Sequence, residues 1–65
     1  MYEEVKAKAV EKYGSINRLS MAIGVTNADL YCAFSGKKPM YPKYRHLIAV
    51  ALGEDEQTLF GENQP

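Results

Sequence analysis

The 65-residue sequence contains a single cysteine, which excludes an intrachain disulfide and a zinc site built on several cysteines. It also lacks any apolar run near the roughly 18 residues that a membrane-spanning helix needs. Residues 1–14 are acidic and amphipathic, without the basic region and apolar block of a signal peptide. These absences predict a cytoplasmic protein in a reducing environment, with no membrane association.

Side chains suited to catalysis or metal binding are scarce as well. His46 is the one histidine, and no cysteine or carboxylate cluster accompanies it at metal-ligand spacing. The sequence shows no nucleophile accompanied by a general base and a group that orients the base. A chain this short also has little room for a substrate pocket. The sequence therefore predicts a protein that is not an enzyme and that uses no cofactor or metal.

Net charge is absent too, since eight basic and eight acidic residues give a formal charge of zero at pH 7. The charges are nevertheless separated along the chain. Residues 1–11 carry −1, residues 12–45 carry +5 because six basic residues stand against Asp29 alone, and residues 46–65 carry −4. A neutral protein of this kind can present one positive surface, although such charges can also serve only to solvate the surface.

What the sequence does have is apolar residues at helical spacing, with no pattern typical of strands. Ser15, Thr26 and Asp55 stand at N-cap positions, and Pro42 suits the first turn of a helix. A glycine follows each of the first four expected helices, where helices commonly end. The expected helices span about 2–13, 16–23, 27–35, 42–52 and 56–60. We therefore expect one all-α domain over residues 1–65, with four to five helices and a polar tail at 61–65.

The segment from Ser15 to Gly36 is central to the prediction. Leu30, Ala33 and Phe34 form an apolar stripe on its second helix, so they are expected to face the core. The opposite face is expected to be exposed, and it carries Asn27, Ala28, Tyr31, Cys32 and Ser35. Two short helices joined by a turn at Gly24, with one face free, are typical of an element that reads a groove.

A residue pattern runs through this segment and continues beyond it. Its positions are Leu19, Ser20, Ile23, Gly24, Val25, Thr26, Leu30, Ala33, Phe34, Ser35 and Gly36, followed by the stretch PKYRHLIAVALGEDEQTLF. From about residue 13 to residue 60 the chain resembles the lambda-repressor-like helix-turn-helix family, which includes phage repressors, Cro-type proteins and many small bacterial regulators. Ser20 stands where the family usually has alanine, and Ile16 where it often has a glutamine that contacts a phosphate.

The resemblance implies a compact lambda-repressor-like fold in which residues 27–35 form a recognition helix for the major groove of double-stranded DNA. It implies a small sequence-specific transcriptional regulator that binds a palindromic operator as a homodimer, with half-sites about 34 Å apart. The expected DNA-binding residues are Asn17, Arg18, Thr26, Asn27, Ala28, Tyr31, Cys32, Ser35, Lys37, Lys38 and Lys43. Those from Ser35 onward are expected to contact phosphates.

A second hypothesis uses the same scaffold for protein binding. The exposed face of residues 27–35 contains no Arg, Lys or Gln, so Asn27 is its only side chain of the types that most often bind base edges. Tyr31 could instead contact a protein partner, and Ala28 and Cys32 could simply be helix-forming or space-filling residues. An antirepressor-like module that docks on another regulatory protein would have this composition.

Overall fold

The computed structural model describes residues 2–61, and all regular secondary structure in this range is helical. The helices are α1 (Glu3–Tyr13), α2 (Ile16–Ile23), α3 (Asn27–Ser35), α4 (Pro42–Leu52) and α5 (Glu56–Phe60). The predicted all-α class is confirmed, and the helix bounds agree with the prediction except that Tyr2 is the N-cap of α1. The predicted polar tail lies outside the described residues apart from Gly61.

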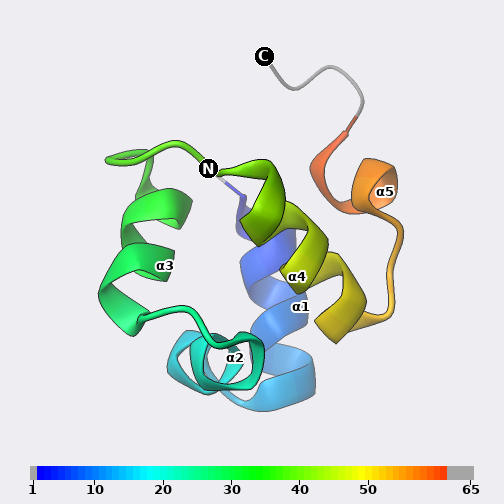
Figure 1. Ribbon diagram of the computed structural model, residues 1–65. Helices are drawn as coiled ribbons and strands as arrows, with labels where there is room; N and C mark the ends of the chain where they lie inside the picture. Colours follow the sequence, from blue (N-terminus) through cyan, green and yellow to red (C-terminus); the bar gives the residue numbers. More distant parts are fainter. Residues whose placement is uncertain (1, 62–65) are drawn as a thin grey trace.

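The five helices surround one apolar core. α2 contacts α1, α3 and α4, and α4 also contacts α1 and α5. In Figure 1, α1 lies behind α4, α2 crosses the bottom of the molecule, and α3 and α5 lie on opposite sides. The radius of gyration, 10.5 Å, is close to the roughly 10.7 Å expected of a compact domain of this length. Because α3 packs chiefly on α2, one side of α3 stays accessible.

Side-chain caps begin α2 and α3, and a glycine ends α2 at the turn between them. The Ser15 hydroxyl accepts a hydrogen bond from the backbone N–H of Arg18 at 3.1 Å, and the Thr26 hydroxyl accepts one from the N–H of Asp29 at 3.2 Å. Each cap satisfies a donor that the first helical turn leaves unpaired. Gly24 ends α2 with φ 75°, a left-handed conformation that glycine adopts without steric cost.

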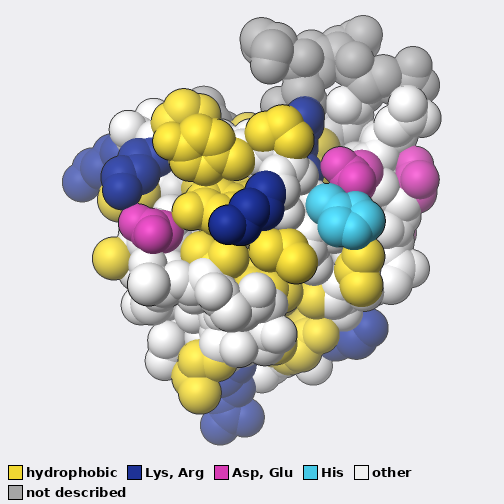
Figure 2. Space-filling view, viewed as in Figure 1, with side chains coloured by type: hydrophobic (Ala, Val, Ile, Leu, Met, Phe, Trp, Pro, Cys, Tyr) yellow, Lys and Arg dark blue, Asp and Glu magenta, His cyan; other side chains and the backbone are white. Residues whose placement is uncertain are grey.

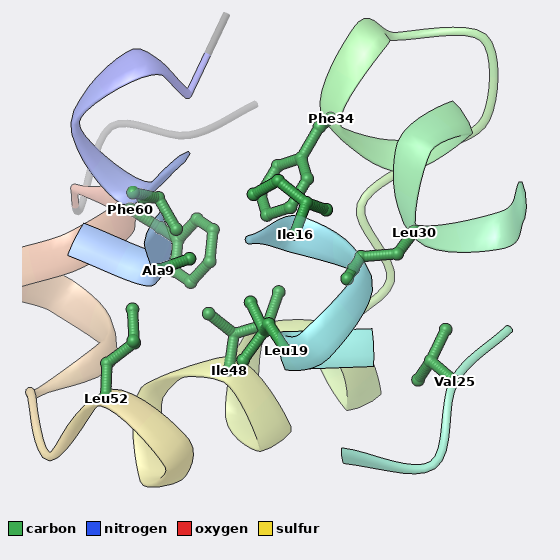
Figure 3. Packing of buried hydrophobic residues seen from close by; sticks show 10 residues of the cluster. Ala9, Ile16, Leu19, Val25, Leu30, Phe34, Ile48, Leu52 and Phe60 are labelled. Atoms are coloured by element: carbon green, nitrogen blue, oxygen red, sulfur yellow. The ribbon is translucent and has the colours of Figure 1, made fainter. Parts of the chain in front are cut away.

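Buried hydrophobic side chains from all five helices meet in the centre, as Figure 3 shows for most of them. The cluster comprises Val5, Ala9, Ile16, Leu19, Val25, Leu30, Phe34, Ile48, Leu52 and Phe60. The predicted stripe of α3 is confirmed, since Leu30, Ala33 and Phe34 are each at most 2% exposed. The buried Ser20 hydroxyl donates to the carbonyl of Asn17 at 2.6 Å, so it has the partner that burial requires.

No helix among residues 2–61 combines the length and the apolar character that crossing a bilayer requires.

Candidate functional site

The side of α3 opposite the core faces outward. Asn27, Ala28 and Ser35 are exposed, and Tyr31 is 48% exposed, as the helical spacing predicts. The apolar stripe on the other side of α3 holds the helix against α2. The result is a surface of one amide, small side chains and one phenol ring on a helix whose orientation is fixed by the core.

Cys32 differs from the prediction, because its side chain is half-buried rather than exposed. The chain after α3 folds back along the helix. The backbone N–H of Lys38 donates to the carbonyl of Cys32 at 3.2 Å, and Nζ of Lys38 lies 3.1 Å from Oδ1 of Asp29. Asp29 and Cys32 are three residues apart and therefore lie about one turn apart on the same side of α3. The returning segment thus lies beside the turn of α3 that contains Cys32.

Lys38 and Asp29 form an ion pair on the protein surface, with 52% and 39% of their side chains exposed. The hydrogen bond from Lys38, a second from Thr26 and the charge of Lys38 hold the pKa of the Asp29 carboxyl below its ordinary value. The hydrogen bond to Asp29 and its charge raise the pKa of Lys38. Both groups are therefore charged at neutral pH. An exposed pair contributes little to stability, and in this structure it brings the Lys38 ammonium next to the Asp29 carboxylate on the surface of α3.

The other basic residues predicted to contact DNA are exposed and lie on three different segments. Lys37 lies in the turn after the helix, Lys43 in the first turn of α4, and Arg18 near the start of α2 beside the exposed Asn17. In contrast to Lys38, Lys37 forms no ion pair within residues 2–61. These ammonium and guanidinium groups are accessible to an external anion.

The two hydroxyl groups among the predicted contacts already have partners. Thr26 caps α3, as described above. The hydroxyl of Ser35 donates to the carbonyl of Cys32 at 3.2 Å, in the last turn of the same helix. Both side chains are exposed, but each serves the ends of α3 in the free protein.

A hydrophobic surface lies between α3 and α4. In Figure 2, hydrophobic side chains gather over this region around a central Lys or Arg side chain. Further Lys or Arg side chains and an acidic one lie at the α3 edge, and the histidine lies beside an acidic side chain at the other edge. Tyr41 is 46% exposed, and its ring meets that of Tyr44 edge to face, with centroids 5.4 Å apart. The Nε atom of Arg45, in the first turn of α4, is buried and has no hydrogen-bond partner.

Among residues 2–61, no group of three or more His, Cys, Asp or Glu side chains is placed to hold a metal ion. Comparison of the chain with family models, curated proteins and solved structures gave no match.

Proposed function

We propose that this chain is a small DNA-binding transcriptional regulator with a lambda-repressor-like fold, in which α2 lies across the DNA backbone and α3 enters the major groove. The observation that carries the proposal is the two-sided character of α3. On its inner side Leu30 and Phe34 are buried in the core. On its outer side Asn27 and Tyr31 are exposed, and a basic turn follows the helix. The major groove of B-DNA, about 12 Å wide, admits one α-helix.

The exposed residues suit the two kinds of contact that such a protein makes. The amide of Asn27 can pair with an adenine edge, and the methyl group of Ala28 can pack on a thymine methyl. Lys37, Lys43 and Arg18 are exposed cations that can neutralise phosphates, and such contacts orient a protein on DNA without reading sequence. The neutral chain would thus use its basic middle segment as the binding surface.

A second copy of the chain completes the proposed arrangement. One recognition helix reads only a few base pairs, so regulators of this type bind as dimers to palindromic sites with half-sites about 34 Å apart. The chain described here would then bind an operator as a homodimer. It would regulate transcription by occupying DNA or by recruiting another protein.

Selection of bound duplexes from a random pool, followed by affinity measurements over a salt series, tests the proposal. We expect a preferred palindromic sequence and an affinity that falls steeply with salt. The slope of log affinity against log salt should be about −0.9 for each phosphate contacted. Failure to bind any duplex at low salt, or an affinity that does not depend on salt, would contradict DNA binding.

The hydrophobic surface between α3 and α4 favours a second candidate function, docking on another regulatory protein. Tyr31 and Tyr41 are each nearly half exposed. Tyrosine is enriched in protein interfaces because its ring buries apolar area while its hydroxyl keeps a hydrogen bond. An antirepressor-like module would use this surface. The two functions differ in their need for Lys37 and Lys38, since protein docking does not depend on phosphate contacts.

A further inference from the structure

Lys38 lies beyond the end of α3 in the sequence, but the fold returns it to that helix. Its backbone N–H is bonded to the carbonyl of Cys32 at 3.2 Å, and its ammonium is bonded to the carboxylate of Asp29 at 3.1 Å. These two contacts hold both the backbone and the tip of Lys38 against α3. The neighbouring Lys37 has no ion pair in the described part of the chain, so the two lysines differ in how firmly they are positioned.

The direction in which Lys38 runs determines where its charge lies. Asp29 is in the first turn of α3, so the ammonium is carried from the C-terminal turn back to the N-terminal part of the helix. In helix-turn-helix proteins the N-terminal residues of the recognition helix are those that contact base edges. The Lys38 ammonium therefore lies toward the end of α3 that would contact bases. A lysine that contacts only phosphates would not need to run back along the helix in this way.

We propose, on the basis of the DNA-binding function above, that Lys38 reads a guanine in the major groove and that Asp29 positions it for this contact. Lysine and arginine are the side chains that most often donate to O6 and N7 of guanine. α3 has no such side chain of its own between Asn27 and Ser35, and Lys38 supplies one from outside the helix. Pairing with Lys38 also neutralises Asp29, whose carboxylate would otherwise be repelled by the phosphates.

The test compares Lys38→Met with Lys37→Met, two variants that each remove one ammonium group from adjacent exposed positions. Duplexes are selected from a random pool by each protein, and affinities are measured for the selected sequence and its single-base variants. Wild-type protein is expected to select guanine at one position of each half-site. K38M is expected to lose the preference at that position, which should be about fivefold to a hundredfold, and to keep the preferences elsewhere.

K37M is the matched control. It is expected to weaken binding to all duplexes by a similar factor, with the base preferences unchanged and the salt slope shallower by about 1. Thermal unfolding of both variants should match that of the wild type, because both side chains are exposed.

The positioning role of Asp29 is tested by the base preference and the affinity for random duplexes of two Asp29 variants. Asp29→Asn removes the charge that holds the ammonium while keeping the size of the side chain. It should reduce the guanine preference and raise the affinity for random duplexes about two- to fivefold, since a carboxylate near the phosphates is lost. Asp29→Glu, which retains a carboxylate for Lys38, should recover much of the preference.

Several outcomes would overturn the inference that Lys38 reads a guanine. A uniform loss of affinity in K38M with base preferences intact would overturn the inference and leave the DNA-binding function standing. The same would follow if wild-type protein bound duplex DNA without selecting guanine, or if K37M and K38M lost the preference equally. If wild-type protein bound no duplex, the inference and the proposed function would both be wrong.

Discussion

Replacing Lys37 and Lys38 together by glutamate is expected to lower the affinity for duplex DNA about 100-fold at about 0.1 M salt. The substitution removes two cations next to α3 and introduces two anions that the phosphates repel, and two charge-assisted contacts account for a factor of this size. The salt slope should become shallower by about 1, because Lys37 no longer neutralises a phosphate, whereas Lys38 is proposed to contact a base. Fluorescence anisotropy with a labelled duplex over a salt series measures both quantities.

A matched control separates this effect from that of net charge. Lys8→Glu combined with Lys12→Glu changes the formal charge of the protein by the same amount, but at α1, where Lys8 pairs with Glu54 near the end of α4. The control should bind DNA within a few-fold of the wild type. Equal losses in the two double variants would contradict a localised interface beside α3. If K37E/K38E bound a protein partner normally but wild-type protein showed no DNA binding, the docking function would be favoured.

Phe34→Ala is expected to remove a large part of the stability of the fold. Phe34 is 2% exposed in the centre of the core, and its ring lies 6.1 Å from that of Tyr2. Truncating a buried phenylalanine costs about 3–5 kcal/mol, whereas a chain of this length has a total stability of about 3–10 kcal/mol. Urea unfolding followed by circular dichroism measures the loss, and a much lower unfolding midpoint is expected.

Met21→Ala serves as the control for this substitution. Met21 is 74% exposed on α2, so its truncation should change the free energy of unfolding by no more than about 0.5 kcal/mol. If F34A were as stable as M21A, Phe34 would not support α3 from the core. The outer face of α3 would then lack the fixed position that DNA binding requires.

The helices could be predicted closely because their ends depend on local signals. Ser15 and Thr26 cap α2 and α3 through bonds to residues three positions on, and Gly24 ends α2 in a left-handed conformation. The inward side of α3 followed from helical periodicity for the same reason. Each of these features is encoded within a few residues, so the single sequence contains the information needed.

The position of Lys38 could not be predicted in this way. Its partner Asp29 is nine residues earlier, across the end of a helix and a turn without regular structure, and no periodic pattern connects the two. Cys32 is half-buried, although its place on the helix favours exposure. The spacing of residues 27–35 showed an exposed face without a cation, whereas the fold pairs the Lys38 ammonium with Asp29 at the edge of that face.

An NMR titration of isotope-labelled protein with a short duplex most directly tests whether α3 is the DNA-binding surface. The duplex would be the one selected from the random pool. We expect the largest changes in amide chemical shift at residues 27–38 and at the start of α2, with much smaller changes in α5. Changes concentrated in α5 and at the C-terminal end of α4, with α3 unaffected, would contradict the proposed mode of binding.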